Sequence, residues 1–336
     1  MTSFRKVNHF VMNKNSGAHE YDLDICRALT NQSHNYIYSY NDIKNLKIRP
    51  RFLALIFFWC RSQLSLFFGN IDVAILSPWM MFIFPKKISI IAISHHYDPS
   101  CFKGLRSLYI KFAHWFFIFQ RNRVSLVVSC SKYWSHFYKK KGFKNTITIH
   151  NGFDIEAMDG ALGAQSTSKV LKKYNLSSKK YIHLGSYGTA KGQKVAYKSL
   201  KGLGFKMIAT TGSKVNLKST PKGFKLINAS YSEYNILLKN AIAVVCMSEF
   251  KEGWCRVLHE GAIHGTAILG SGLGGMNELL KVGSLSSSKS STLLTDLKKR
   301  VKNEYQLNKL KKLYRSFTLN KFYKAWIKCI DDVIVD

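Results

Sequence analysis

Short apolar segments alternate with segments of helical periodicity along most of the chain, and this alternation restricts the possible folds more than any other feature. The first cycle runs from an apolar segment at 7–12, through an amphipathic pattern at 19–30, to a second apolar segment at 35–40. Buried strands followed by helices are typical of parallel sheets that are covered on both faces. The pattern therefore predicts an α/β protein built on doubly wound parallel sheets.

The rest of the chain continues this alternation. Further strands are expected at 71–76, 88–94, 126–131, 146–150, 181–184, 206–210, 225–228, 243–247 and 266–269, and helices at 193–200, 233–240 and 319–333. With 336 residues, 46% of them hydrophobic, the chain is long enough for two domains with separate cores. A stretch rich in Gly, Ala and Ser at 160–168 is expected to be a loop that marks the boundary between them.

Two glutamates, Glu252 and Glu260, are separated by seven residues. Gly253-Trp254 interrupts any earlier regularity and apolar residues then recur with helical spacing, so Glu252 is expected at the start of a helix. If the intervening residues are helical, Glu260 lies roughly 12 Å further along, which matches the span from sugar to ribose in a folded nucleotide sugar. Two acceptor-only carboxylates suit two sets of hydroxyls, although two arbitrary glutamates are more often solvated.

A glycine-rich segment follows the expected strand at 266–269. Gly274 and Gly275 lie between that strand and a helix that opens at Met276, where backbone N–H groups can approach phosphate or sugar oxygens. The segment also fits the dinucleotide-binding pattern G-x-G-x-x-G, with Asp296 at 21 residues beyond the last glycine. That function is not favoured, because the fingerprint should open a domain and only a few dozen residues follow.

Residues 248–278 resemble the donor-binding segment of retaining glycosyltransferases of the GT-B fold, particularly glycosyltransferase family 4. The family pattern is Ser…Glu-Gly-aromatic…Glu-Ala…Gly…Gly-Gly…Glu, and Gly261 replaces its alanine here. The segment 150–154 is similar to the family's Asn-Gly-Val-Asp segment, which leads into the interdomain linker. The resemblance is strong from 185 to 278 and weak before 129.

Two further loops resemble phosphate-binding loops of the family. In 185–192, Lys191 matches the family lysine, but Ser186 stands where the family has an arginine, so Lys194 or Arg256 is left as a candidate for the second cation. The segment 15–20 resembles the Gly-Gly loop after the first strand; Gly17 is retained, and alanine replaces the second glycine.

His95 and His96 follow the expected strand at 88–94, at the carboxyl edge of a parallel sheet, where ligands bind in open α/β folds. The resemblance implies that a histidine near this position faces the reacting sugar. The sequence does not distinguish between the two, and a role in capping the loop stays open.

The resemblance implies a GT-B architecture of two Rossmann-like domains that face a cleft. It implies an acceptor-binding domain at 1–155, a donor-binding domain at 156–315, and a helix at 316–336 that returns to the first domain. It also implies transfer of a sugar from a nucleoside diphosphate sugar to a hydroxyl, with retention of the anomeric configuration. No cofactor or metal is expected. A bacterial surface polysaccharide such as O-antigen, capsule or lipopolysaccharide is the product that the family implies.

The resemblance assigns roles to individual residues. Lys191 would neutralise the departing diphosphate, helped by backbone N–H groups near Gly17 and Gly274-Gly275. Glu260 would bind the ribose and Glu252 the donor sugar, as positioning groups rather than as the acid and nucleophile of a glycosidase. Ser186, Arg256 and Tyr231 complete the residues expected to bind the donor, and His95 and His96 those expected at the reacting sugar.

The pair Asp22 and Asp24 imitates the metal-binding D-x-D motif of the other glycosyltransferase fold. Because both fall on the expected helix at 19–30, they are interpreted as surface charge. Seven scattered cysteines without a C-x-x-C pair indicate reduced thiols in a cytosolic compartment and make metal ligation unfavoured.

The net charge of +32 indicates an anionic partner or simple lysine drift. Cations flank aromatic and aliphatic residues at 49–68 and 103–123, a pattern that suits an anionic membrane surface carrying a lipid-linked acceptor. Burial of those aromatics in the core is the alternative. The apolar stretch 52–68 contains Arg61 and Gln63, so a buried or interfacial helix is expected rather than a spanning one. No signal peptide is visible, and no nucleic-acid module is recognised.

Two other functions remain as alternatives. One is a nucleotide-sugar epimerase or phosphorylase with the same fold. The other is a non-catalytic membrane or nucleic acid binding protein, which the absence of an arginine at Ser186 favours.

Overall fold

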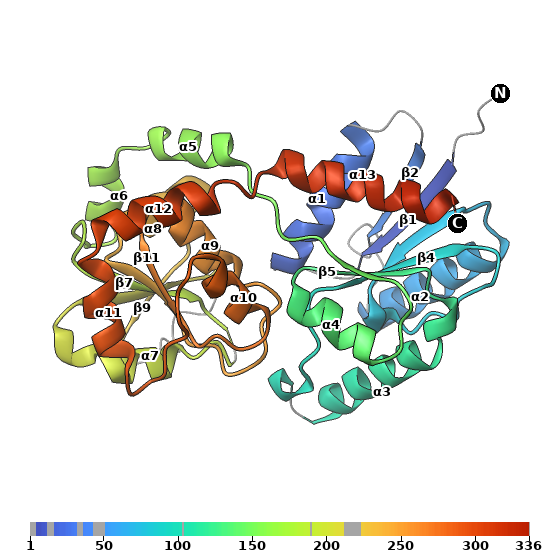
Figure 1. The fold of residues 1–336 in the computed structure, drawn as a ribbon, viewed down its shortest axis with the longest axis horizontal. Helices are drawn as coiled ribbons and strands as arrows, with labels where there is room; N and C mark the ends of the chain where they lie inside the picture. Colours follow the sequence, from blue (N-terminus) through green and yellow to red (C-terminus); the bar gives the residue numbers. More distant parts are fainter. Residues whose placement is uncertain are drawn as a thin grey trace. The chain divides into compact units, whose positions relative to one another are not determined.

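The computed structural model describes residues 5–11, 17–31, 36–42, 51–102, 104–188, 190–211 and 223–335. The chain divides into two compact units (Figure 1). Unit 1 comprises Met1–Gly152 and Asn320–Asp336, and unit 2 comprises Phe153–Leu319. The contacts thus divide the chain three residues before the predicted boundary at 155, and attach the C-terminal segment to unit 1 from residue 320 onward.

In unit 1, the described residues form a parallel six-stranded sheet with the order β2-β1-β3-β4-β5-β6. Its strands are β1 (Arg5–Val11), β2 (Tyr36–Asp42), β3 (Val73–Leu76), β4 (Ser89–Ser94), β5 (Leu126–Ser129) and β6 (Thr146–Thr148). Its helices are α1 (Gly17–Asn31), α2 (Arg51–Phe68), α3 (Leu105–Phe119), α4 (Lys132–Lys140) and α13 (Leu319–Val335), with 3-10 turns η2 (Pro78–Met80), η3 (Pro99–Cys101) and η4 (Arg121–Arg123). The order reverses between β1 and β3, which makes this pair the switch point of the sheet.

The unit 1 sheet is covered by helices from both ends of the chain. Helices α2, α3 and α4 contribute Phe58, Phe117 and Tyr138 to one hydrophobic core. Helix α13 packs against α1 (Figure 1), where the Tyr21 ring meets the rings of Phe322 and Trp326 edge to face, at 4.9 and 6.2 Å between centroids. Unit 1 therefore needs the C-terminal helix to complete its packing.

In unit 2, the described residues form a parallel five-stranded sheet with the order β11-β10-β7-β8-β9. Its strands are β7 (Tyr181–Ser186), β8 (Lys206–Thr210), β9 (Lys225–Ile227), β10 (Ala243–Cys246) and β11 (Ala267–Gly270). Its helices are α5 (Ile155–Gly163), α6 (Thr167–Lys173), α7 (Gln193–Leu200), α8 (Tyr231–Asn240), α9 (Arg256–Ile263), α10 (Gly275–Val282), α11 (Leu293–Val301) and α12 (Glu304–Tyr314), with the 3-10 turn η5 (Lys201–Leu203). Here the switch point lies between β7 and β10.

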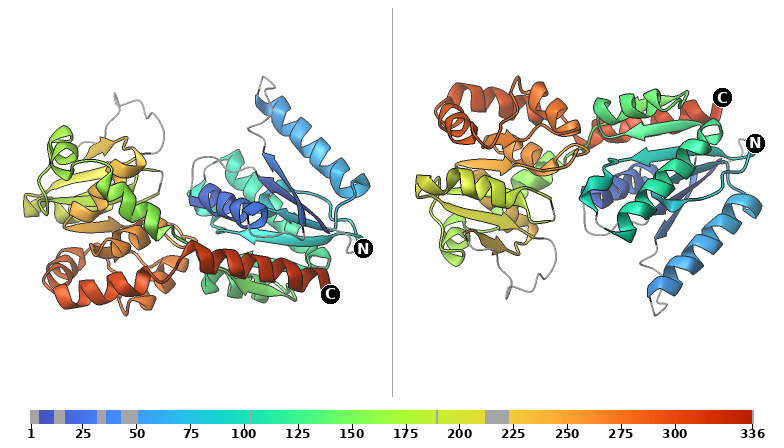
Figure 2. Two further views of the ribbon diagram at one scale, coloured as in Figure 1. Left: turned by 90° about the horizontal axis from the view of Figure 1, so that it is seen from above. Right: turned by 90° about the horizontal axis from the view of Figure 1, so that it is seen from below.

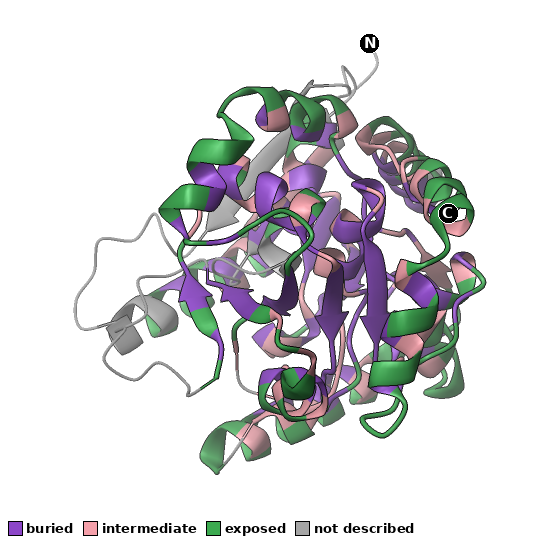
Figure 3. Cartoon of the chain, turned by 90° about the vertical axis from the view of Figure 1, so that its left-hand side faces the viewer, coloured by how far each residue is buried: buried purple, intermediate pink, exposed green. Residues whose placement is uncertain are grey.

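Each face of the unit 2 sheet has its own core. Helices α7 and α11 pack on one face through Leu200 and Leu297, and helices α6 and α8 on the other through Leu171 and Ile236. Figure 2 shows helices on both sides of each sheet, and Figure 3 shows burial concentrated in the strands while outer helical turns are exposed. Both-face coverage explains why these strands are apolar runs rather than alternating ones.

One loop prediction is wrong. The stretch 160–168, expected to be a loop, is mostly helical, because Asp154 caps the start of α5 by accepting the N–H of Ala157 and Met158 is buried beneath the helix. The serine-rich segment 284–291 is a loop, and buried Arg300 holds it against the sheet by donating to the carbonyl oxygen of Ser286 and to that of Ile268 on β11.

All seven cysteines lie in the described part of the chain and are free thiols. Cys130, Cys246 and Cys329 are buried, as expected for reduced core thiols. In the described part of the chain, no helix is both long and apolar enough to span a membrane.

Candidate active site

The candidate site of unit 2 lies at the switch point of its sheet. The loop after β7 carries Lys191, the loop after β10 carries Ser248 and Glu252, and the loop after β11 carries Gly274. Because β7, β10 and β11 are neighbours and parallel, their carboxyl ends meet at one edge. Open α/β sheets bind ligands at this kind of position.

Lys191 and Glu252 form an ion pair at this edge. Lys191 Nζ donates to Glu252 Oε1 at 2.7 Å, and Ser248 Oγ donates to the same oxygen at 2.6 Å. The Lys191 ammonium also lies 4.8 Å from the centroid of the buried Phe250 ring. Burial alone lowers the pKa of Lys191, but the charge of Glu252 and its hydrogen bond outweigh this, and the pKa of Lys191 is raised from its usual value. The lysine is therefore a fixed cation at neutral pH.

The backbone of Glu252 is anchored to the glycine-rich loop. Its N–H donates to the carbonyl oxygen of Leu273 at 3.1 Å, and its own carbonyl accepts the N–H of Gly275 at 2.8 Å. Gly274 has a φ of 67°, and a Cβ there would lie 2.6 Å from the carbonyl oxygen of Glu252. A residue with a side chain could not keep this contact. Gly274 and Gly275 thus form the strand-to-helix turn that the sequence predicts, directly before α10.

The loop that carries Lys191 is equally close-packed. Ala190 has a φ of 58° and Gly192 a φ of 71°, so both neighbours of the lysine are in the left-handed region. The carbonyl of Ala190 accepts the N–H of Glu249 at 2.8 Å, which ties the β7 loop to the β10 loop. Left-handed backbone at a residue other than glycine carries a conformational cost and is concentrated at functional sites.

Glu260 lies on α9 among polar and charged partners. Tyr234 Oη donates to Glu260 Oε2 at 2.5 Å, and Arg256 Nε is 3.6 Å from Glu260 Oε1. The Arg256 guanidinium lies over the ring of Phe153, at 4.7 Å from its centroid. Partial burial and then the charge of Glu260 raise the pKa of the exposed Tyr231. Arg256, Tyr231 and Tyr234 thus surround one carboxylate.

A buried histidine holds α9 in position. Trp254 Nε1 donates to His259 Nδ1 at 2.9 Å, and His259 Nε2 is 3.0 Å from the carbonyl oxygen of Tyr314 on α12. Since Nδ1 accepts, Nε2 must carry the proton and donate. Gly261, where the family has alanine, sits so close to β10 that a Cβ would lie 2.7 Å from Val244 Cγ2. The departure from the family pattern therefore matches unusually tight packing of α9 on the sheet.

The predicted helical interval between the two glutamates is only partly correct. α9 begins at Arg256, and Glu252 precedes it in an extended bridge to Gly274. The 12 Å separation expected for a continuous helix therefore does not apply. Glu252 lies in the loop after β10 and Glu260 on α9, and the two carboxylates have different partners.

The two residues that could supply the second cation, in place of the family arginine at Ser186, lie on different helices. Ser186 ends β7 with an exposed side chain, and its carbonyl accepts Gln193 Nε2 at 2.6 Å. Lys194 is exposed on α7, whereas Arg256 is paired with Glu260.

In unit 1, the predicted His95 is at the end of β4 and contacts two residues of α1. Its Nε2 is 3.4 Å from Asp22 Oδ1, and its ring meets Tyr21 edge to face at 5.1 Å. His9 Nε2, from β1, is 3.9 Å from the same Asp22 oxygen. Burial lowers the pKa of His9 to about 4, against the opposing charge of Asp22. His96 is half-buried in the same loop, and Gly17 is the first residue of α1.

The interpretation of Asp22 and Asp24 as surface charge is wrong, because both are 4% exposed. Asp24 Oδ1 accepts Arg27 Nη1 at 2.8 Å, and Asp22 lies between the two histidines. The helical pattern of the sequence located both on α1, but the side of the helix that faces the sheet depends on partners from β1 and β4.

Sequence reasoning also left out two residues of the unit 2 site. Ser248 is the serine that begins the family pattern, so the resemblance contained a signal for it. Tyr234 has no motif around it, and only the fold brings it from α8 to Glu260.

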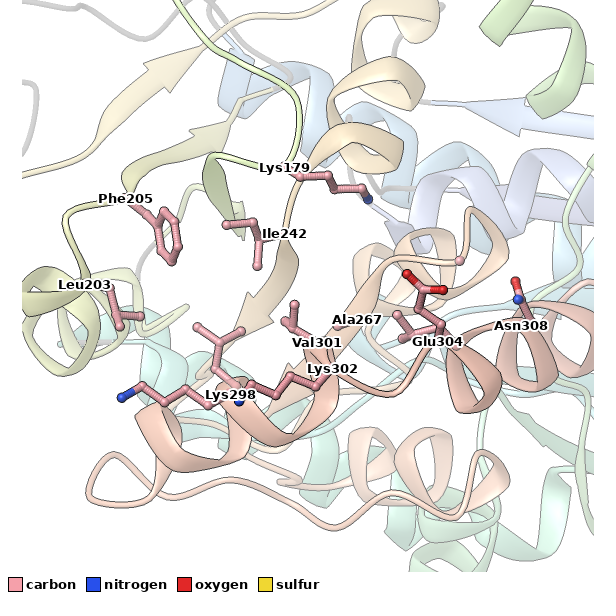
Figure 4. Close-up of a pocket in the computed structure, with 13 residues that line it drawn as sticks. Lys179, Leu203, Phe205, Ile242, Ala267, Lys298, Val301, Lys302, Glu304 and Asn308 are labelled. Atoms are coloured by element: carbon pink, nitrogen blue, oxygen red, sulfur yellow. The ribbon is translucent and has the colours of Figure 1, made fainter.

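Unit 2 also contains a separate hollow of about 720 Å³ at the amino-terminal edge of its sheet (Figure 4). Its lining is mainly apolar and includes Leu203, Phe205, Ile242 and Val301, with Lys298 and Lys302 at its border. Ile242 directly precedes β10, so the hollow lies at the opposite end of the strands from Lys191 and Glu252. It is not part of the candidate site. Among the described residues, no group of three or more His, Cys, Asp or Glu is arranged to hold a metal ion.

The two doubly wound domains have the architecture of the GT-B glycosyltransferases, and the predicted fold class is confirmed. The chain is similar to the structure of HepE from Anabaena in complex with UDP and glucose, with a TM-score of 0.67, 15% sequence identity, and coverage of 98% of this chain and 100% of that one. It is also similar to sucrose-phosphate synthase from Thermosynechococcus elongatus, with a TM-score of 0.75, 10% identity, and coverage of 98% and 99%.

A glycosyltransferase from Rickettsia africae is similar as well, with a TM-score of 0.66, 14% identity, and coverage of 98% and 99%. At these identities the similarities establish the fold. No protein-family model and no curated protein sequence matches the chain.

Proposed function

We propose that the protein is a glycosyltransferase that moves a sugar from a nucleoside diphosphate sugar to a hydroxyl of a glycan or lipid-linked acceptor. The observation that carries the proposal is the cluster of Lys191, Glu252 and Ser248 beside Gly274, at the switch point of the unit 2 sheet. The similar HepE structures contain UDP with glucose and UDP-glucose, which supports a donor of this class.

In this proposal the cation and the carboxylates have separate tasks. Lys191 neutralises the charge that develops on the departing diphosphate, and the N–H groups at the start of α10 assist it. Glu252 orients the donor sugar through its hydroxyls, and Ser248 fixes the carboxylate. Glu260, positioned by Tyr234 and Arg256, accepts hydrogen bonds from the ribose.

Four finer features belong to the same proposal by resemblance to family 4. The anomeric configuration is retained, the reaction proceeds without a metal ion, and His95 or His96 acts at the reacting sugar. The product is part of a bacterial surface polysaccharide, made in the cytoplasm at the inner face of the membrane. Polar groups placed for diphosphate and sugar hydroxyls support transfer, but they do not identify the sugar, the base or the acceptor.

The test is donor binding and slow donor hydrolysis by the purified chain across a panel of nucleoside diphosphate sugars, with and without a chelator. One donor is expected to bind saturably, with or without chelator. Glu260→Gln should weaken its binding about tenfold or more, since a charged acceptor is lost. Lys191→Ala should lower turnover by about a hundredfold or more, while donor binding falls less.

Matched controls are Glu156→Gln and Lys201→Ala, which change exposed residues of the same unit. Binding of no donor in the panel, or equal losses in the controls, would contradict the proposal. Conversion of the donor into an epimer would instead establish the epimerase alternative.

A further inference from the structure

Unit 1 has an unusually apolar exposed surface, which we call the aromatic face. It is formed by Ile56, Phe57, Leu64 and Phe68 of α2, Ile83 of the loop after η2, and Leu105, Leu108, Phe112, Trp115 and Phe119 of α3. The most exposed are Leu105 at 85%, Phe68 at 82% and Phe119 at 70%. Single exposed apolar residues are ordinary, but ten of them on two helices and on the segment to which both helices are bonded mark an interaction surface.

Helix α3 is apolar on two opposite sides. One side, with Ile110, Ala113 and Phe117, is buried against the sheet. The other consists of residues 105, 108, 112, 115 and 119, whose alternating spacing of three and four places them in one stripe. Phe112, Trp115 and Phe119 stack on one another along this stripe, with ring centroids 5.6 and 5.9 Å apart. The protein's own core therefore does not account for the second stripe.

Hydrogen bonds join the two helices into one surface through residues 79–84. From α2, Gln63 makes a reciprocal pair with Ile83, accepting its N–H at 2.8 Å and donating to its carbonyl at 2.9 Å. From α3, Tyr109 Oη donates to the carbonyl of Trp79 at 2.8 Å. Gln120, which follows α3, donates to the carbonyl of Phe82 and accepts the N–H of Phe84, both at 2.9 Å. The aromatic face is thus a preformed part of the fold.

The charges around the aromatic face are almost all positive. Between residues 51 and 123 the only acidic residues are Asp72 and Asp98. Asp72 accepts the backbone N–H of Lys6, and Asp98 caps η3. The exposed cations are Arg61, Lys86, Lys87, Arg106, Lys111, Arg121 and Arg123.

A hollow of about 590 Å³ lies where the apolar stripe meets this positive charge. Ile83, Phe84 and Phe119 line its apolar part, and Lys86 and Arg123 its charged part. An anionic group bound there would have apolar side chains on one side and two cations on the other. This arrangement complements a phospholipid, whose acyl chains and phosphate meet at the ester level.

We propose that the aromatic face inserts into the surface of an anionic bilayer and that the hollow between Lys86 and Arg123 binds a phospholipid headgroup. A partner of positive or neutral charge does not fit the surrounding cations, and no described helix is able to span the membrane. Docking in this way would bring unit 1 to a lipid-linked acceptor, and in that respect the inference rests on the proposed function. The binding itself does not depend on catalysis.

The test uses the full chain and vesicles of phosphatidylcholine alone or with about one third phosphatidylglycerol. The protein should sediment with the anionic vesicles and much less with the neutral ones. A triple variant, Phe112→Ser, Trp115→Ser and Phe119→Ser, should bind at least about tenfold more weakly. The matched control is Tyr305→Ser, which removes a side chain that is 81% exposed on α12 of unit 2.

The charged part is tested separately with Lys86→Gln combined with Arg123→Gln. Binding to anionic vesicles should fall about tenfold or more, since each cation near an anionic surface adds roughly a fivefold factor. Lys298→Gln with Lys302→Gln, an exposed pair on unit 2, should change it little. Equal losses in the two pairs would mean general charge attraction and would overturn the assignment of the hollow.

Two further results separate the remaining explanations. A dimer of the parent protein that dissociates in the triple variant, without any vesicle binding, would show that a second copy covers the face and would overturn the proposal. Turnover of soluble donor should be equal in the parent and the triple variant. If the parent protein binds vesicles but turns over no donor, the result would contradict the transferase function and would still support the docking surface.

Discussion

Lys191 and Glu252 are each other's nearest charged partner in the candidate donor site, at 2.7 Å. An ammonium group has three N–H donors, so Lys191 can bond a diphosphate oxygen while it keeps Glu252 as an acceptor. The carboxylate therefore holds the ammonium group in place and leaves N–H donors of Lys191 available for a diphosphate. This arrangement explains how a lysine can be fixed at the site and still stabilise charge that develops during the reaction.

In unit 1, the buried carboxylate of Asp22 lies between His9 and His95. A carboxylate beside an imidazole orients the ring. If His95 acts at the reacting sugar, as the resemblance implies, Asp22 is its positioning residue.

Replacing Asp22 by asparagine is expected to slow transfer about tenfold or more and to leave donor binding unchanged, since the donor-site cluster lies in unit 2. The measurements are kcat for transfer and donor affinity, of which only kcat should change. Asp24→Asn is the matched control, because Asp24 is equally buried on the same helix but pairs with Arg27. Equal rate losses in the two variants would indicate a structural effect and rule out positioning.

The sequence could predict residues that belong to a local motif, and it missed those that depend on distant partners. Lys191, Glu252 and Gly274 were found because their pattern lies within single loops. Tyr234 and Asp22 were missed because their significance comes from contacts with Glu260 and with His95, which are distant along the chain.

At the scale of elements, the loop that carries Lys191 packs closely against the residue after β10, and this close contact requires glycine at position 192. Gly192 has a φ of 71°, and a Cβ there would lie 1.8 Å from the carbonyl oxygen of Met247. The contact involves backbone on both sides, so no side-chain rotation can relieve the overlap.

Gly192→Ala is therefore expected to lower the free energy of unfolding of unit 2 by at least about 2 kcal/mol and to weaken donor binding at the same time. Urea unfolding and donor titration measure the two effects. Gly202→Ala is the control, since a Cβ at Gly202 meets nothing within 4 Å. An alanine variant at Gly192 with parent stability and donor affinity would show that the loop is not constrained as described.

Most strand positions could be predicted because buried parallel strands are short apolar runs with polar or glycine ends. Strand β8 has the predicted bounds, and β10 ends one residue earlier than predicted. The helices at 155–173 were missed because glycine, alanine and serine are weak signals for a loop when a cap and buried apolar positions favour helix.

At the scale of the whole molecule, the alternation of elements predicts the fold class but not the order of strands within each sheet. Sheet order depends on which way each crossover turns, and no residue pattern in a single strand encodes it. The switch points at β1/β3 and β7/β10 became visible only with the pairing of the strands. The glycine-rich loops indicated where each site would be, because such loops follow the strands beside a switch point.

Four of the five buried histidines in the described part of the chain make both units sensitive to mild acid. Burial lowers the pKa of His9 and His114 in unit 1, and of His264 in unit 2, to about 4, and that of His183 in unit 2 to about 3. The ordinary value of 6.5 applies to the unfolded chain, which therefore takes up protons first as the pH falls. Their contribution to stability is complete above about pH 6.5 and is lost as the pH falls from there towards 4.

Urea unfolding is expected to show this loss between pH 7.5 and pH 5, at roughly 2 kcal/mol per buried histidine, or about 4 kcal/mol for each unit. Burial raises the pKa of Glu233, but hydrogen bonds from Lys173 and Tyr174 outweigh this and lower it to about 2, so its effect falls below this window. Measurement in about 0.5 M salt removes the general repulsion that a net charge of +32 adds on acidification.

His114 allows a test at a single site, because its ring stacks on Tyr97 at 3.6 Å between centroids and its Nε2 has no hydrogen-bond partner among the described residues. His114→Phe keeps an aromatic ring in the stack and removes the titrating group. It should reduce the acid-induced loss in unit 1 by about half and leave that of unit 2 unchanged. An unfolding free energy that is the same at pH 7.5 and pH 5 in the parent protein would contradict the burial of these histidines as neutral groups.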